Sequence, residues 1–333
     1  MENQTALTKE ESLTPVEMAM NLAIKSVIEG GLGWNVLEEA TTGALIGAIS
    51  SNVQWINEIS PIDQSDNIHW ILYSKGGRDF SSESWTGSDF SLILRVSENS
   101  FRVAAFQAKR AANRENGFKA IQISPAAGLL RPEPQIIRML RHSDQYRSLT
   151  TDNIFTASWV HFLIYGRTEI FHLPLTKMNE YCQKVYLFDH KVKTKEKAHE
   201  ENSGGLYPKR KIEKIWKNFK TSHTYNSNNK SRFSELIACG ARTPANQDAE
   251  GWMSIKGRDA AAAFIDATAP HCPALLISSK SSYKPVVSHS KSFKGASIGI
   301  TIKEVMASME ALKAKLDASK SVGRSRTDKM GKS

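Results

Sequence analysis

The chain has 333 residues, of which 44 are Lys or Arg and 34 are Asp or Glu, so its formal net charge is +10. With 40% hydrophobic residues, the composition excludes a disordered or fibrous protein and is typical of a folded globular one. The sequence has no run of 18 apolar residues and no basic-then-apolar N-terminus, so we expect neither a membrane partner nor secretion. Three widely spaced cysteines, Cys182, Cys239 and Cys272, argue against a disulfide framework and favour a cytoplasmic location.

The first part of the chain is predicted to form two helices and a β-hairpin. Pro15 directly after Thr14 is typical of a helix start. Residues 89–96 alternate in polarity and are joined by a short polar turn to the run 101–109, which predicts two antiparallel strands. The other elements predicted here are, in chain order, helix 16–28, helix 36–49, loop 51–67 and strand 68–73.

The second part is predicted to add a buried strand and further helices. Residues 157–165 form an unbroken apolar run, which is typical of a central strand covered on both faces. The remaining predicted elements are, in chain order, helix 134–149, helix 174–184, strand 185–188, helix 259–268, strand 274–278 and helix 302–316.

Charge and composition divide the chain unevenly. Residues 1–100 carry 5 basic and 14 acidic side chains, whereas residues 184–232 carry 13 basic and 5 acidic ones. A local basic excess indicates nucleic acid or another acidic surface as the partner, and a solvated linker is the alternative. We expect a core domain over residues 1–190, a basic linker or insert over 191–232, a small C-terminal α/β portion over 233–317, either packed on the core or separate, and a disordered basic tail over 318–333.

The predicted hairpin brings four polar positions into one argument. Asp89 begins its first strand, and Gln107 and Lys109 end its second strand. In a hairpin the start of one strand lies beside the end of the other, and residues two apart point to the same face. Glu39, from the helix predicted before the hairpin, adds a second carboxylate.

These residue types suit phosphodiester hydrolysis assisted by a metal ion. Mg²⁺ prefers oxygen ligands and keeps several waters, so Asp89 and Glu39 would bind it directly. Gln107 would supply a carbonyl oxygen or hold a metal-bound water, and Mn²⁺ is a substitute at such a site. Lys109 would lie near the attacking water and the phosphate, where its charge stabilises the transition state.

The same residues carry a resemblance to a known family. The stretches Gly87-Ser88-Asp89-Phe90 and Phe106-Gln107-Ala108-Lys109-Arg110, after a helix with a glutamate, resemble the PD-(D/E)XK nuclease superfamily. More narrowly, they resemble its Q-x-K branch, which includes Mrr-type restriction endonucleases. The resemblance covers residues 34–165 and implies a restriction-endonuclease-like mixed β-sheet core flanked by helices, with Mg²⁺-dependent cleavage of DNA. It also implies a role in restriction, anti-phage defence or mobile-element biology.

Several alternatives remain open at the candidate cluster. Glu38 competes with Glu39, which we prefer because the apolar residues six and seven positions downstream match the helix of the resembling branch. Glutamine is a weak ligand, so Gln107 also fits a nuclease-like protein that binds nucleic acid without cutting it. A structure-specific repair or resolvase-type nuclease is a further alternative. Asp189-His190-Lys191 is a second match to the pattern, which we interpret as a loop at a strand end.

Basic residues outside the cluster are candidates for nucleic-acid binding. These are Arg110, Arg114 and Lys119, which follow the cluster, and Lys209, Arg210 and Lys211, which lie in the basic segment. The apolar residues after Lys211 recur at helical spacing and indicate a buried helix face. DNA is the expected partner, with RNA as an alternative and a homodimer as an open arrangement. The histidines lack ligand spacing, so we interpret them as structural.

Overall fold

The computed structural model describes residues 13–32, 36–59, 68–71, 87–111, 118–119, 133–146, 157–217, 219, 224–225, 231–268, 274–278 and 286. The chain divides into two compact units, residues 1–296 and residues 297–333, and no residue of the second unit is among those described. The helix predicted over residues 302–316 and the tail predicted over residues 318–333 therefore lie outside the described residues.

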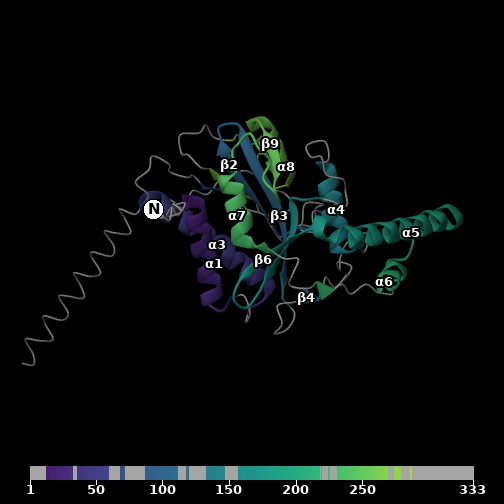
Figure 1. Cartoon of the computed structure of the whole chain (residues 1–333). Helices are drawn as coiled ribbons and strands as arrows, with labels where there is room; N and C mark the ends of the chain where they lie inside the picture. The colour runs from purple at the N-terminus through teal and green to yellow at the C-terminus, as the bar shows by residue number, and fades with distance from the viewer. Residues whose placement is uncertain are drawn as a thin grey trace, which may run out of the picture. The chain divides into compact units, whose positions relative to one another are not determined.

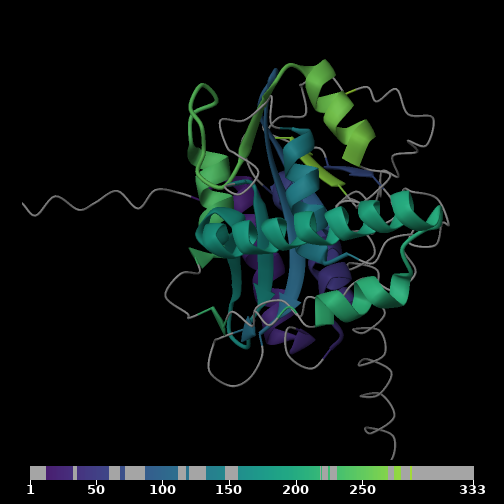
Figure 2. The same ribbon diagram turned by 90° about the vertical axis from the view of Figure 1, so that its right-hand side faces the viewer.

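A mixed β-sheet of eight strands forms the centre of the first unit (Figures 1 and 2). β3 pairs with β2 in antiparallel and with β5 in parallel orientation, and β10 runs parallel to β2. The strand order is β1 (Ile68–Ile71), β10 (Ala274–Ser278), β2 (Phe90–Ser97), β3 (Ser100–Arg110), β5 (Val160–Tyr165), β6 (Ile170–Pro174) and β8 (Ser231–Arg232), with β9 (Met253–Lys256) paired to β3. Two short strands, β4 (Phe118–Lys119) and β7 (Thr224–Tyr225), form a separate sheet.

Helices cover both faces of the sheet. One face packs against α1 (Pro15–Glu29), α3 (Glu38–Ile59) and α7 (Phe233–Arg242). The other packs against α4 (Gln135–Gln145), the 3-10 turn η2 (Leu175–Met178), α5 (Asn179–Ser203) and α8 (Arg258–Thr268), and α6 (Lys209–Lys217) joins this layer. The predicted α/β class, a mixed sheet flanked by helices, is confirmed.

Alternation along the central strands explains why both faces are covered. In β3, Val103 and Ala105 belong to the core on the α4 side, whereas Ala104 and Phe106 belong to the core on the α1 side. All four side chains are fully buried. The unbroken apolar run predicted to be a two-sided strand is β5, whose six residues are all buried.

The first helix begins where the sequence predicts. Thr14 Oγ1 accepts a hydrogen bond from the Glu17 backbone amide, and the Glu17 carboxylate accepts one from the Thr14 amide. This reciprocal pair is a capping box, and Pro15 occupies the first helical position, where a missing amide hydrogen costs nothing.

Two predicted local assignments are wrong. Residues 51–59, expected to be loop, continue α3, because Val53 and Ile56 extend the buried face of that helix. Residues 185–188, expected to be a strand, lie inside α5, where Val185 and Val192 are buried two turns apart on the same side. A run of four apolar residues does not distinguish a strand from a half-buried helix.

The predicted domain boundaries also require correction. Residue 190 lies inside α5, and the segment predicted as a linker contains the end of α5 and all of α6. The C-terminal portion supplies β10, which lies between β1 and β2, and β9, which pairs with β3. Residues 233–278 therefore complete the same sheet. Among the described residues, no helix is both long and apolar enough to cross a membrane.

Candidate active site

One end of the β2–β3 hairpin gathers the predicted polar residues. Phe90 pairs with Phe106, so Asp89, one position earlier, lies opposite Gln107, and its amide donates to the Phe106 carbonyl over 2.7 Å. Asp89 Oδ2 accepts two hydrogen bonds, from the Ala108 amide at 2.6 Å and from Gln107 Nε2 at 2.5 Å. The hairpin therefore brings Asp89 and Gln107 into direct contact, as the sequence predicts.

The start of α3 completes the cluster. Glu38 Oε1 lies 3.1 Å from Lys109 Nζ, and Glu38 Oε2 accepts a hydrogen bond from the Arg110 amide at 3.1 Å. The Glu38 and Lys109 side chains are 30% and 22% exposed, so a solute can reach this ion pair. We define the candidate cluster as Glu38, Asp89, Gln107 and Lys109.

The helix glutamate at the cluster is Glu38, not the preferred Glu39. Glu38 is the first residue of α3, and its carboxylate bridges Lys109 and the backbone of β3. Glu39 is exposed, because one residue along a helix turns a side chain by about 100°. Apolar periodicity shows which side of a helix is buried, but it does not show which residue of the first turn meets a neighbouring strand.

Two residues that sequence reasoning missed hold this end of α3 in place. Thr42 Oγ1 donates to the Glu38 carbonyl at 2.9 Å and lies 2.8 Å from the Tyr165 hydroxyl, which donates to it. Burial, first, and the nearby Asp89 and Glu38 carboxylates raise the pKa of Tyr165 above its usual range, while the Thr42 hydrogen bond opposes this shift. The phenol therefore stays protonated as a donor. Its position at the end of β5, beside the end of β3, is the signal that could have found it.

Gly87 fixes the approach of the chain to Asp89. Its φ of 69° lies in the left-handed region, and an added Cβ would lie 2.6 Å from the Gln135 carbonyl oxygen. The turn before β2 therefore packs against the first turn of α4, which accounts for the glycine in the Gly87-Ser88-Asp89 stretch.

The donor set of the cluster fits an oxygen-ligated cation. Asp89 and Glu38 supply carboxylates, and Gln107 Oε1 is a buried acceptor without a hydrogen-bond partner among the described residues. No group of three or more His, Cys, Asp or Glu residues in the described part of the chain is arranged to hold a metal. Mg²⁺, which keeps several waters and needs few protein ligands, is the cation that this set suits.

The predicted nucleic-acid-binding residues are distributed over several elements. Arg110 is exposed at the end of β3, next to the cluster. Lys119 lies in β4, and its side chain is not described. Arg114 lies outside the described residues. Lys209, Arg210 and Lys211 are exposed in the first turn of α6.

The second match to the sequence pattern lies within a helix. Asp189, in the middle of α5, has a side chain that is 3% exposed and pairs with Lys193 at 2.9 Å. The interpretation of Asp189-His190-Lys191 as a loop at a strand end is therefore wrong.

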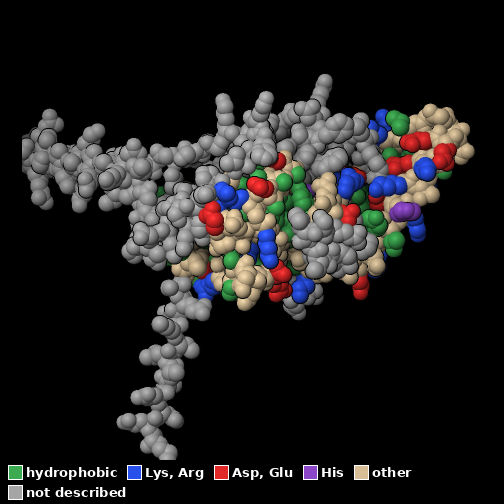
Figure 3. All heavy atoms as spheres, turned by 90° about the horizontal axis from the view of Figure 1, so that it is seen from above, with side chains coloured by type: hydrophobic (Ala, Val, Ile, Leu, Met, Phe, Trp, Pro, Cys, Tyr) green, Lys and Arg blue, Asp and Glu red, His purple; other side chains and the backbone are tan. Residues whose placement is uncertain are grey.

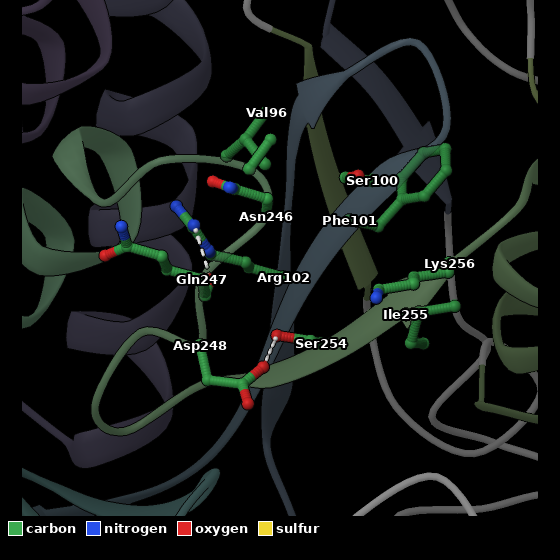
Figure 4. Close-up of a pocket in the computed structure, with 11 residues that line it drawn as sticks. Val96, Ser100, Phe101, Arg102, Asn246, Gln247, Asp248, Ser254, Ile255 and Lys256 are labelled. Atoms are coloured by element: carbon green, nitrogen blue, oxygen red, sulfur yellow. Dashed lines mark hydrogen bonds between the residues drawn. The ribbon is translucent and has the colours of Figure 1, made fainter.

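A hollow of about 90 Å³ lies at the opposite, turn-proximal end of the hairpin (Figure 4). Arg102, which is 1% exposed, donates there to the carbonyls of Gly240, Pro244 and Gln247. Ser254 Oγ donates to Asp248 at 2.7 Å. The hollow is far smaller than typical ligand pockets of about 300–1,000 Å³, and its polar groups anchor the loop after α7.

Comparison with protein-family models, curated proteins and solved structures gave no match.

Proposed function

We propose that this protein is a Mg²⁺-dependent endonuclease that hydrolyses phosphodiester bonds in DNA. The observation that carries the proposal is the meeting of Glu38, Asp89, Gln107 and Lys109 at one end of the sheet. This combination of two carboxylates, an amide and an ammonium group is the set that metal-assisted phosphodiester hydrolysis needs.

Each residue of the cluster has a role that its contacts support. Asp89 is oriented by two donors on β3, so its carboxylate is held in one position for a cation. Glu38 holds the Lys109 ammonium, which would orient a water and contact a phosphate oxygen. A bound Mg²⁺ would polarise the phosphoryl oxygen and lower the pKa of its water. Gln107 fixes Asp89 and offers its carbonyl oxygen to the cation or to its water.

The order of elements supports the nuclease proposal. A helix carrying Glu38 precedes the β2–β3 hairpin, and β3 continues through α4 to the parallel strand β5. This is the order that the resemblance to PD-(D/E)XK nucleases implies, and we therefore propose a restriction-endonuclease-like core. Restriction or anti-phage defence is the setting that the resemblance favours.

Cleavage of supercoiled plasmid with Mg²⁺, Mn²⁺ or EDTA tests the proposal. We expect metal-dependent nicking or linearisation that falls by at least about a hundredfold in Asp89→Asn and in Lys109→Met. The first substitution removes a carboxylate that would hold the cation, and the second removes a positive charge that would stabilise the transition state. Lys256→Met, at the opposite end of β3, is the matched control and should cleave like wild type. Cleavage that survives both cluster substitutions would refute the site.

A second candidate function is nucleic-acid binding without cleavage, and Gln107 favours it. Its amide nitrogen donates to Asp89 where the resembling superfamily has a second carboxylate in most members. A measurement of duplex DNA binding in EDTA, made beside the plasmid assay, separates the two functions. Binding by the wild type, with no cleavage of plasmid in Mg²⁺ or Mn²⁺, would support the second.

A further inference from the structure

Helices α5 and α6 pack together as a helical hairpin (Figure 2). The Trp216 ring of α6, 1% exposed, lies 5.0 Å from the Phe188 ring of α5, and Phe219 lies 4.4 Å from the same ring. Ile212 is also buried. The apolar side of α6 is thus buried against α5, as the sequence predicts for the apolar residues after Lys211.

The opposite side of α6 carries a row of three basic side chains. Arg210, Lys214 and Lys217 are spaced i, i+4 and i+7, so they share one face, and all three are exposed. The nine-residue helix contains five basic side chains and one acidic one, Glu213. We call Arg210, Lys214 and Lys217 the α6 row.

The α6 row differs from Lys193 and Lys197 of α5 in its lack of acidic partners among the described residues. On α5, Lys193 pairs with Asp189 at 2.9 Å and Lys197 lies 3.8 Å from Glu201. Basic and acidic side chains are accordingly interspersed along the projecting α5–α6 hairpin in Figure 3. Within the described part of the chain, no residue of the α6 row makes an ion pair.

A second set of cations lies on α5 beside α6. Lys184, Lys191 and Lys195 are spaced i, i+7 and i+11, are exposed, and form no ion pair with any described residue. Lys184 and Lys191 lie four residues before and three residues after Phe188, so this set borders the side of α5 that contacts α6. The hairpin therefore carries two basic sets, one on each helix.

We propose that the α5–α6 hairpin is an arm that binds the phosphate backbone of duplex DNA without sequence preference. The α6 row spans about 10 Å at the rise of a helix, and each DNA strand presents a phosphate about every 3.4 Å along the axis. A membrane surface is disfavoured, because a helix that lies on lipid needs a free apolar side. The inference rests on the proposed function for the identity of the polyanion, but not for the cleavage chemistry.

The proposed arm changes which basic residues of α6 we expect to contact nucleic acid. Of Lys209, Arg210 and Lys211, only Arg210 belongs to the α6 row, since Lys211 lies over the Tyr207 ring at 5.8 Å. Lys214 and Lys217 replace the other two, because helical spacing rather than sequence adjacency determines which side chains face one ligand.

Binding of a fluorescent duplex of about 30 base pairs, measured by anisotropy in EDTA with the full-length chain, tests the arm. The variant Arg210→Gln, Lys214→Gln, Lys217→Gln removes the α6 row. Its matched control, Arg258→Gln, Lys25→Gln, Lys256→Gln, removes the same charges from α8, α1 and β9. Near 0.1 M salt we expect the Kd to rise at least about tenfold in the row variant and less than about twofold in the control. The slope of log affinity against log salt should fall by about 3 in the row variant, because about 0.9 counterion is released per phosphate contact.

Three outcomes would overturn the proposal that the arm binds duplex DNA. These are wild-type affinity in the row variant, an equal loss in the two variants, and arm-dependent binding of single-stranded RNA or phosphatidylserine vesicles in place of duplex. EDTA prevents metal-dependent cleavage, so the result is separable from the proposed function. Arm-dependent binding without plasmid cleavage would support the arm and refute the nuclease, and cleavage with an unaffected row variant would do the reverse.

Discussion

Gln107 is the residue that decides what the candidate cluster can do. Its amide nitrogen donates to Asp89 over 2.5 Å, while its carbonyl oxygen is buried without a hydrogen-bond partner among the described residues. A buried acceptor left unpaired costs about 1–3 kcal/mol, so a cation or its water at this oxygen would recover that free energy. Hydrogen bonds therefore fix Asp89 in place, and we expect a ligand at Gln107 Oε1 to stabilise the cluster.

Replacing Gln107 by Glu should make stability depend on a divalent cation. The substitution puts a second carboxylate where an amide now donates to Asp89, so in EDTA we expect a loss of about 2 kcal/mol, or roughly 5 °C in Tm. Mg²⁺ would bind between the two carboxylates and recover most of the loss. Thermal melts with and without Mg²⁺ measure this, with Gln107→Ala as the control that lacks the added charge. A Gln107→Glu protein whose Tm ignores Mg²⁺ would contradict the prediction.

A buried pair of histidines lies between β5 and β6. His161 Nδ1 is 3.2 Å from His172 Nδ1, and His161 Nε2 is 2.8 Å from the Gly251 carbonyl. Since Nε2 donates to that carbonyl, Nδ1 of neutral His161 accepts from His172. Burial, followed by the neighbouring His172, lowers the pKa of His161 well below its usual value, and burial lowers the pKa of His172 to about 4. Their interpretation as structural residues agrees with this burial.

Stability should therefore fall as the pH is lowered through the acidic range. The folded-state pKa values of His161 and His172 are both depressed, so below about pH 6.5 the unfolded chain binds protons that the folded protein does not bind. We expect His172 alone to cost about 2 kcal/mol between pH 7 and pH 4.5, and His161 to add to it. Urea unfolding at the two pH values measures the loss. In His172→Gln, which keeps a hydrogen-bonding side chain, the loss should shrink, and an unchanged pH dependence would show that carboxylates cause it.

At the scale of elements, the sequence predicts the site's framework better than its details. The β2–β3 hairpin follows from alternation and a polar turn, and its register brings Asp89 opposite Gln107. The choice between Glu38 and Glu39 does not follow, because a contact between α3 and β3 depends on the angle at which they pack. The contact between Tyr165 and Thr42 does not follow for the same reason, since the two hydroxyls meet across 123 positions of chain.

The turn before β2 gives a prediction about an element. Gly87→Ala should lower the free energy of unfolding by about 2–3 kcal/mol, because φ is 69° and the new Cβ would meet the Gln135 carbonyl at 2.6 Å. Gly43→Ala is the matched control: Gly43 is exposed within α3 with no atom within 4 Å of an added Cβ, so it should stabilise by about 0.5–1 kcal/mol. Chemical denaturation measures both, and a neutral Gly87→Ala would show that the turn relaxes without cost.

At the scale of the whole molecule, the chain closes its sheet with its late segments. β10 lies between β1 and β2, although 177 residues or more separate it from either strand. Local periodicity predicts that residues 274–278 form a strand, but it carries no information about which strands pair with them. The candidate cluster and the basic α5–α6 hairpin therefore belong to one compact unit. The cluster lies where the start of α3 meets the end of the β2–β3 hairpin, and the basic hairpin belongs to the helical layer.

This closure predicts that residues 1–190 do not fold by themselves. The fragment lacks β10, so β1 loses its pairing partner and the backbone of β2 is left open on that side. It also lacks α7, whose Phe233 and Ile237 are fully buried in the core that α1 and α3 share. We expect the fragment to show no cooperative thermal transition by circular dichroism and to be digested rapidly by protease, with the full-length chain as the control. A cooperative transition in the fragment would contradict this account, because it would mean that the hairpin and its flanking helices form a core without β10.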